Sequence, residues 1–561
     1  MILGLAGMLV ANAAVLACAR EAVRRWGTRQ GHLDVLLFFV ARFLLISLVV
    51  IAAGTTGTFN GFWLSAAGVV ALAILRPRVS KPRVPFWGYI WTCAAAIVLL
   101  RLLLQVWFFA PHNHDALSYH LTKIPEWIRA GGFTREMGVD THATFPAGFE
   151  LIEAWWVVFL RHDVLIELAG VEFLLLASAA CFALARELGM SEKASAWAAL
   201  LYALTPGLQV SATSCLNDVP IAALVLSTFA LLLAKAPWPW VAAIALLGVG
   251  IKPTYGYALP GFLVLVAKSA GTGLPVGVVA LVPGLFWYAR NALWFGNPMH
   301  PVGSRGLIGG EGTLKIQFGP SLSSGWRNIR ALFNVRVYDD QVGYGALLSH
   351  ISGWGAVAFA CGSLALWGWV RETPRAGRVL LGMSVSLVSV LFLVNHDDWC
   401  LRFVLFFPSV LAVAAVWAAE RMRPVLGLVT AGAAFQFAAT FFPVDHRLEN
   451  AIRLAKMSWR ERSVGSILES QPPGVEPVLF HIVEAVHSRG ESYLIYRPDY
   501  TRPVFYFRGR TIEDLRKSIE ETGARYVYCS KVNPRSDPLI EDAVGRELLE
   551  RCGERLFGVK R

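Results

Sequence analysis

Charged residues are scarce in this 561-residue sequence. Asp, Glu, Lys and Arg make up 16% of it, against roughly 25% in soluble globular proteins. The shortage lies in the first 443 residues, which hold 52 of the 90 charges, whereas residues 444–561 hold 38. Mean hydropathy is +0.52 and 55% of the residues are hydrophobic. These figures exclude a single soluble enzyme, a disordered chain and a secreted disulfide scaffold, and they predict a polytopic membrane protein followed by a soluble domain.

Common catalytic and metal-binding motifs are missing as well. The sequence has no CxxC pair, no HExxH and no GxSxG elbow. The glycine-rich stretch 303–312 lacks the GK[ST] of a nucleotide-binding loop. The eight cysteines are scattered, and five lie in or beside apolar runs. In an oxidising compartment Cys529 and Cys552 can pair, and two free thiols are the equal alternative.

The net charge of +12 comes from short basic connections between apolar runs. Short loops rich in Lys and Arg are cytoplasmic by the positive-inside rule, so the charge needs no nucleic-acid partner and none is expected. This sidedness places loops 54–60, 111–163, 214–218, 293–351 and 395–401 outside, together with the C-terminal domain. The basic residues are Arg20, Arg24, Arg25, Arg29, Arg76, Arg78, Lys81, Arg83, Arg371, Arg375 and Arg378.

The apolar runs predict about fourteen membrane spans, since roughly 20 apolar residues cross the hydrocarbon. Lys252 and Pro253 interrupt the run 238–268, which we interpret as two short spans. Residues 147–160 contain two glutamates and a Trp155–Trp156 pair, and we expect a helix on the outer membrane surface. The other spans lie near residues 1–19, 33–53, 58–75, 86–110, 164–185, 195–213, 219–235, 274–292, 352–370, 378–395, 402–420 and 424–443.

Three regions follow from this pattern. Residues 1–85 form an N-terminal extension of three spans, and residues 86–443 form the main transmembrane domain with long external loops at 111–163 and 293–351. Residues 444–561 alternate strand-like and helical runs, which predicts a small α/β domain. The strand-like runs are Pro477–Val483, Ser492–Tyr496 and Arg525–Ser530, and the helical ones are Ile512–Thr522 and Pro538–Cys552.

The densest polar cluster is residues 111–132, directly after the fourth span. Asn113 can cap a helix there, and Gly131 with Gly132 can end it. At helical spacing Asp115 shares a face with Tyr119. The other shared face carries His120, Lys123 and Trp127. A carboxylate beside His114, His120 and a phenol is a candidate general base; the alternative is that Asp115 only offsets a helix dipole.

A second acidic position and three cations accompany this cluster. Asn217 and Asp218 precede an apolar run, where an ordinary helix cap is the alternative to a functional role. Lys252, Arg290 (followed by Asn291) and Arg402 lie at ends of apolar runs. A cation near hydrocarbon needs a partner, and a phosphate is one candidate, whereas snorkelling to lipid headgroups is the other.

A divalent metal ion is left open as a cofactor. Six histidines fall on the predicted outer side, and together with Glu150 or Glu153 they contain metal-ligating groups without a recognisable ligand spacing. They are His112, His114, His120, His142, His300 and His396.

Five segments resemble the GT-C superfamily of membrane glycosyltransferases, closest to its protein-mannosyltransferase and lipid A aminoarabinose-transferase branch. The resemblance covers about residues 86–443. Its segments are DALSYHLTKIPEWIRAGG (from residue 115), NDVP (217), IKPTYGYALPG (251), WYARNALWFGNPMHP (287) and LRFVLFFPSVLAVAA (401).

The resemblance implies a GT-C fold and a role for particular residues. Asp115 matches the acidic residue of the first external loop that acts as or positions the base, and Asp218 matches the second acidic position. Lys252, Arg290 and Arg402 fall where such enzymes hold a lipid phosphate. The sequence departs from the branch in having DALSYH in place of a DE or DD pair, which leaves the metal requirement open.

Sidedness and resemblance together predict an inverting glycosyltransferase of the bacterial inner membrane. Nucleotide sugars are cytoplasmic, so an outward-facing enzyme must use a polyprenyl-phosphate sugar. The expected partners are that donor, membrane lipid, and a glycan, lipid or protein acceptor. The alternatives are a polysaccharide polymerase or ligase, a lipid or sugar transporter or flippase, and a non-catalytic glycan-binding protein.

Overall fold

The computed structural model describes most of the chain. The described residues are 2–76, 89–111, 113–135, 141–266, 273–302, 322–332, 351–394, 400–439, 456–457, 471–481, 491–507, 509–530 and 537–560. His112, His396 and most of the predicted loop 293–351 lie outside them.

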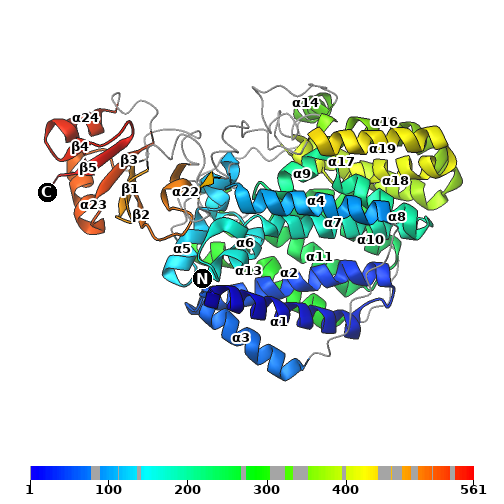
Figure 1. The fold of residues 1–561 in the computed structure, drawn as a ribbon, viewed down its shortest axis with the longest axis horizontal. Helices are drawn as coiled ribbons and strands as arrows, with labels where there is room; N and C mark the ends of the chain where they lie inside the picture. Colours follow the sequence, from blue (N-terminus) through cyan, green and yellow to red (C-terminus); the bar gives the residue numbers. More distant parts are fainter. Residues whose placement is uncertain are drawn as a thin grey trace.

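An α-helical bundle makes up the chain as far as residue 439, and a small sheet domain lies at one end of it (Figure 1). The bundle helices are α1 (Ile2–Trp26), α2 (Gly31–Thr56), α3 (Gly61–Leu75), α4 (Tyr89–Phe108), α5 (Lys123–Ala130), α6 (Gly148–Val158), α7 (Leu168–Glu187), α8 (Glu192–Ala203), α9 (Pro206–Ala212), α10 (Asp218–Leu233), α11 (Trp238–Ile251), α12 (Leu259–Leu263), α13 (Leu274–Phe295), α14 (Leu322–Leu332), α16 (Ala356–Glu372), α17 (Pro374–Leu393), α18 (Pro408–Arg421) and α19 (Arg423–Ala439). Shorter turns of helix are η1 (Ala116–His120), η2 (Thr141–Thr144), η3 (Asp163–Leu165), η4 (Pro253–Ala258), η5 (Ile351–Trp354) and η6 (Cys400–Val404).

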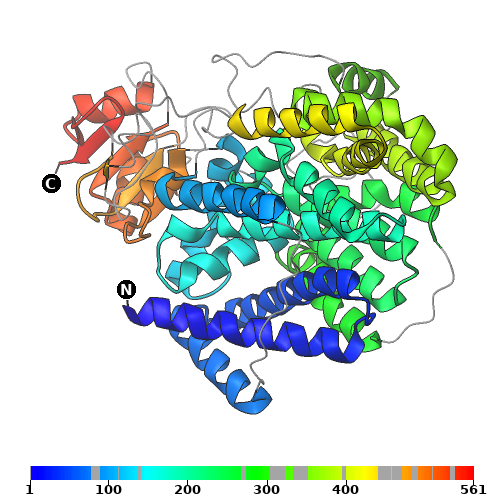
Figure 2. The ribbon, with the colours of Figure 1, turned by 45° about the vertical axis from the view of Figure 1, so that its right-hand side comes forward.

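Five helical segments are long and apolar enough to cross a membrane: α1, α2, η3 with α7, α13 and α17. Five shorter apolar helices accompany them among the described residues. Every predicted span overlaps at least one of the observed helices, whereas the number fourteen stays a prediction. The first three helices form a layer along one edge of the bundle (Figure 2).

Proline follows each of two breaks in this bundle. The predicted span 195–213 is two helices, α8 and α9, because Thr205 before Pro206 has an extended ψ of 121°. The run 238–268 breaks after α11, as predicted. Gly277 of α13 packs against Pro239, and Gly284 packs against Leu246. These contacts show that α11 and α13 run parallel.

Helix α6 corrects the prediction of an exposed surface helix. Its 11 residues cover about 16 Å, too short to cross the hydrocarbon. The non-crossing orientation agrees with its contacts, because Gly148 meets Gly250 at the end of α11 and Phe159 meets Gly4 at the start of α1. The helix is nevertheless buried, and Trp155 is 1% exposed with its indole N–H donated to Asn12. The surface interpretation was therefore wrong because protein, rather than lipid, covers the tryptophan.

Three connections between described helices, those after α1, α7 and α18, meet at one end of the bundle. His32 after the first connection lies 2.8 Å from Glu187, at the end of α7. Ser191 donates to Glu420 over 3.2 Å, joining the connection after α7 to the one after α18. These contacts group the connections on one side of the bundle, and the candidate site residues described below lie at the other end of the same helices.

The C-terminal domain is a five-stranded sheet with strand order β2-β1-β3-β5-β4. β1 is parallel to β2 and β3, and β5 is antiparallel to β3 and β4. The elements are β1 (Val478–His481), α22 (Glu491–Ile495), β2 (Val504–Phe507), α23 (Ile512–Thr522), β3 (Tyr526–Cys529), α24 (Pro538–Gly545), β4 (Leu549–Arg551) and β5 (Leu556–Val559). The α/β class and helix α23 agree with the sequence prediction, while Ser492–Tyr496 is helical instead of a strand, and Pro538–Cys552 ends in β4. Cys529 and Cys552 are free thiols.

Candidate active site

Asp115 lies just after α4, where the chain enters η1. Asn113 caps this turn, because its side-chain oxygen accepts the backbone N–H of Asp115 at 3.0 Å. The following residues Ala116–His120 form a π-helix, closed by the Leu121 N–H on the Ala116 carbonyl at 2.8 Å. The predicted cap is confirmed, as is the end of α5 at Gly131, which has a φ of +67°. The π-turn changes the predicted α-helical spacing between Asp115 and the residues that follow it.

Asp218 is the first residue of α10, a helix in which every residue but Leu232 is buried. A carboxylate at this end is stabilised by the helix dipole. Lys252 at the end of α11 donates to Asp218 Oδ1 over 2.9 Å. Arg402 in η6 lies with its Nε 3.9 Å from Asp218 Oδ2. Arg402 also donates to Asp115 Oδ2 over 2.7 Å.

Four residues from four separate segments therefore form one chain of charges, which we call the acid–cation chain: Asp115, Arg402, Asp218 and Lys252. Phe403 supports both cations, with its ring centroid 4.6 Å from Lys252 Nζ and 5.1 Å from Arg402 Cζ. Sequence reasoning missed this ring, although it follows Arg402 directly.

The two aspartates differ in exposure. The Asp218 side chain is 2% exposed, whereas that of Asp115 is 28% exposed. Asp218 is enclosed by its two cations, so it can hold them but cannot easily reach a substrate. Arg402 occupies Oδ2 of Asp115, and no described residue donates a hydrogen bond to Oδ1. Asp115 is thus the carboxylate that can meet an incoming hydroxyl group.

Charge around Asp115 keeps its carboxylate ionised. Burial raises the pKa of Asp115, but Arg402, His120 and His114 together outweigh burial and hold that pKa below its ordinary value. The carboxylate is consequently a proton acceptor at neutral pH and a weak base.

A second polar network lies directly behind η1, and we call it the buried network: His120, Lys123 and Glu150. Glu150 Oε1 lies 2.9 Å from His120 Nδ1 and 2.7 Å from Lys123 Nζ. The Lys123 and Glu150 side chains are each 1% exposed. Burial would raise the pKa of Glu150, but Lys123 and His120 lower it to about 2. Burial lowers the pKa of both His120 and Lys123.

The two glutamates considered as metal ligands, Glu150 and Glu153, lie in buried surroundings. Glu150 belongs to the buried network, and burial together with Glu150 raises the pKa of Glu153 well above its ordinary range. Among the described residues, no three His, Cys, Asp or Glu side chains gather as they would around a metal ion.

The remaining predicted residues lie around these networks. Arg290 and Asn291 both donate to the Thr144 carbonyl, at 2.9 and 3.0 Å, so they hold η2 against the end of α13 and do not join Lys252 and Arg402. Tyr119 packs with its ring centroid 4.4 Å from that of His120. His114 is exposed, and Asn217 is the buried N-cap residue of α10.

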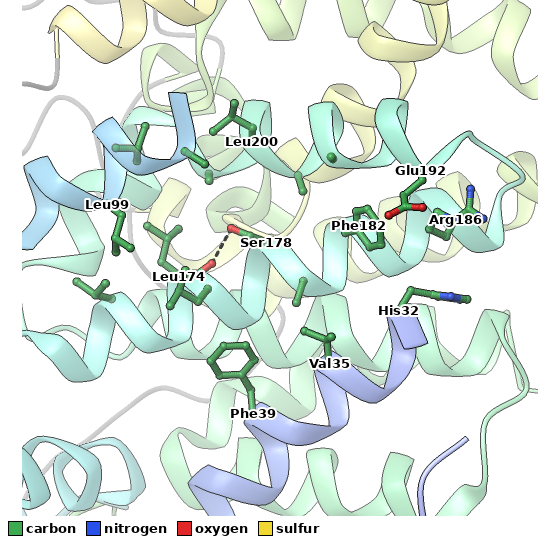
Figure 3. Close-up of a pocket in the computed structure, with 18 of the residues that line it drawn as sticks. His32, Val35, Phe39, Leu99, Leu174, Ser178, Phe182, Arg186, Glu192 and Leu200 are labelled. Carbon is green, nitrogen blue, oxygen red and sulfur yellow. Dashed lines mark hydrogen bonds between the residues drawn. The ribbon is translucent and has the colours of Figure 1, made fainter. Parts of the chain in front are cut away.

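An apolar groove of about 660 Å³ lies apart from the site, between α2, α4, α7 and α8 (Figure 3). Its walls carry side chains such as Phe39, Leu99 and Leu174. His32 and Arg186 lie together at one end of the groove with Glu192 (Figure 3). No sequence-predicted site residue lines this groove.

Comparison with solved structures finds a similar fold. The crystal structure of ArnT from Cupriavidus metallidurans bound to undecaprenyl phosphate matches 83% of this chain and 97% of its own chain. The TM-score is 0.53 and the sequence identity is 12%. This likeness shows the fold, so the predicted GT-C architecture is confirmed. No protein-family model and no curated protein matches the sequence.

Proposed function

We propose that this protein is an inverting glycosyltransferase that takes a sugar from a polyprenyl-phosphate donor. The observation that carries the proposal is the acid–cation chain, in which the partly exposed carboxylate of Asp115 contacts Arg402 and a second cation, Lys252, lies beyond Asp218. The fold supports the same class, because the matching ArnT structure is described as bound to undecaprenyl phosphate.

The acid–cation chain has the groups that such a transfer needs. The carboxylate of Asp115 takes the proton of an acceptor hydroxyl, and the resulting oxygen nucleophile attacks the anomeric carbon. The bond between that carbon and the phosphate oxygen breaks on the opposite face, and polyprenyl phosphate leaves with the electron pair. Lys252 and Arg402 neutralise the charge on the departing phosphate. A phosphate is a good leaving group, so a weak base such as Asp115 suffices.

Asp115→Asn tests this mechanism with purified protein, a polyprenyl-phosphate sugar and an extract of cell-envelope acceptors. We expect wild-type protein to transfer the sugar and Asp115→Asn to lose transfer while remaining folded. Asp34→Asn, at the other end of the bundle, is the matched control and should transfer normally. Transfer by Asp115→Asn at the wild-type rate would remove the proposed base. Glycolipid and glycan profiling of a deletion strain would identify the sugar and the acceptor.

The proposal includes a multi-pass location in the bacterial inner membrane with the site facing the periplasm. Basic residues in the connections at the opposite end support this orientation. Cys552 is an exposed thiol of the C-terminal domain. A membrane-impermeant maleimide should therefore label it in intact spheroplasts, and Cys552→Ser should lose that label. Labelling of Cys552 only after permeabilisation would reverse the orientation and exclude a periplasmic reaction.

A further inference from the structure

The C-terminal domain contacts the segment that carries Asp115. Helix α22 packs against η1, the π-turn that begins directly after Asp115. The sheet domain and the region of α5 and α6 lie side by side in both views (Figures 1 and 2). Helix α22 and the chain that follows it contribute four tyrosines to this contact, which we call the tyrosine clamp: Tyr493, Tyr496, Tyr500 and Tyr506.

The tyrosines form two pairs, and each pair ends on an acid of the external loop. The Tyr496 and Tyr506 hydroxyls are 2.8 Å apart, and Tyr496 donates to Glu126 of α5. The Tyr493 and Tyr500 hydroxyls are also 2.8 Å apart, and Tyr493 donates to Asp163 over 3.3 Å. Both acids lie in the loop 111–163, on either side of α6.

Burial and a backbone hydrogen bond make this contact between the C-terminal domain and the loop 111–163 a rigid one. Tyr493, Tyr496 and Tyr500 are 3%, 0% and 1% exposed. The backbone N–H of Asp163 donates to the Pro498 carbonyl at 3.0 Å. Phenols buried this deeply need hydrogen-bond partners, so losing the carboxylate acceptor would destabilise the contact between the domain and this segment.

The tyrosine clamp is connected to the buried network through α5. Glu126 lies one turn after Lys123 on α5, and Lys123 binds Glu150, which in turn binds His120 at the end of η1. The segment 116–130 is therefore held by α6 through Glu150 and by the C-terminal domain through α22 and the tyrosines.

We infer that the C-terminal domain positions the catalytic loop, with Tyr496 and Glu126 as positioning residues that fix η1 so that Asp115 stays against Arg402. This inference rests on the proposed function, since it assigns a task within that active site. It gives residues 491–507 a role in turnover that needs no contact with substrate.

Tyr496→Phe tests the inference in the full-length protein, because it keeps the ring and removes the hydroxyl. Tyr526→Phe is the matched control, since Tyr526 lies in β3 of the same domain and is only partly buried. We expect Tyr496→Phe to lower kcat roughly 10-fold, the effect of losing one hydrogen bond to a charged group. KM for the polyprenyl-phosphate sugar should stay unchanged, because Lys252 and Asp218 do not lie on η1.

The pH profile separates positioning from a general loss of structure. The charged groups around Asp115 are His114 and His120 on its own segment and Arg402 on η6, with Asp218 and Lys252 beyond Arg402. If η1 moves away from Arg402, the pKa of Asp115 rises. The acidic limb of kcat/KM should then move to higher pH in Tyr496→Phe and stay in place in Tyr526→Phe.

Amide hydrogen exchange provides a readout that needs no activity. Residues 113–130 should exchange faster in Tyr496→Phe than in wild type and Tyr526→Phe. Unchanged kcat, pH limb and exchange would overturn the inference, as would an equal loss in Tyr526→Phe. If Tyr496→Phe fails to fold, Glu126→Ala removes the same hydrogen bond from the other side and is judged by the same measurements. Activity retained by Asp115→Asn would instead refute the proposed base, while the exchange data would still decide whether the clamp exists.

Discussion

The acid–cation chain and the buried network are built from similar groups and differ in their access to solvent. In the first, Arg402 links Asp115 to Asp218, and the Asp115 side chain is 28% exposed. In the second, Glu150 holds His120 and Lys123, and its side chain is 1% exposed. A carboxylate held by cations is therefore not by itself a mark of catalysis in this protein.

The two networks differ in the task that their exposure permits. A group that exchanges a proton with a substrate must reach it, and only Asp115 among these carboxylates has appreciable exposure. A buried ion pair is costly to break, because removing one partner leaves the other charge unpaired. The buried network consequently fixes the shape of the segment that presents Asp115.

The largest effect is expected from exchanging the two aspartates for asparagine. Asp115→Asn should reduce kcat roughly 10²- to 10⁴-fold, the usual contribution of a general base. Asp218→Asn should mainly raise the donor KM, because Lys252 and Arg402 lose the carboxylate that holds them. Steady-state kinetics on both variants measures the split. A larger loss of kcat in Asp218→Asn than in Asp115→Asn would reverse the roles derived from exposure.

Glu150→Ala should act on stability. It leaves Lys123 and His120 buried without their carboxylate, which costs about 3–5 kcal/mol when a buried pair is broken. Thermal unfolding in detergent should show a large drop in Tm, against little change for the exposed control Glu192→Ala. A stable Glu150→Ala protein without activity would show that Glu150 takes part in the reaction. The division into a catalytic acid–cation chain and a structural buried network would then be wrong.

The sequence could predict the bundle and the members of the site, but less of their pairing. Long apolar runs predict helices because the backbone N–H and C=O groups of a segment in hydrocarbon must hydrogen-bond to each other. Asp115, Asp218, Lys252 and Arg402 stood out because a charge beside an apolar run is unusual. That all four meet depends on how α10 and α11 pack with η6, contacts distant in sequence that a single sequence cannot show.

Two predictions failed for a related reason. Trp155 and its neighbours have the composition of a membrane-surface helix, but tertiary packing buries α6 within the protein. Ser492–Tyr496 has strand-forming residues, yet most of it lies in helix α22, and its tyrosines are buried where α22 packs against η1. In both segments the same side chains suit two environments, and long-range packing selects between them.

Lys252→Ala should have a smaller effect, on donor binding. Losing a charge-assisted contact to the phosphate is expected to raise the Kd of polyprenyl phosphate roughly 10- to 100-fold. Calorimetry in detergent measures this, and Lys235→Ala, a lysine at the opposite end of the bundle, is the matched control. Equal affinity in both variants would show that Lys252 serves only to neutralise Asp218. Lys252 would then have a structural role, as the residues of the buried network do.

The smallest effect is expected from His114→Gln. His114 is exposed, and its positive charge when protonated helps to lower the pKa of Asp115 less than Arg402 does. Asp115 acts as a base when ionised, so activity is present above its pKa and lost as pH falls through that value. Removing the imidazolium of His114 raises the pKa of Asp115, so the acidic limb of kcat/KM should move to higher pH. The shift should be less than about one pH unit, because solvent screens an exposed charge. A shift that persists in high salt would show that His114 acts through a direct contact in the site. His114 would then belong with the groups of the active site despite its exposure to solvent.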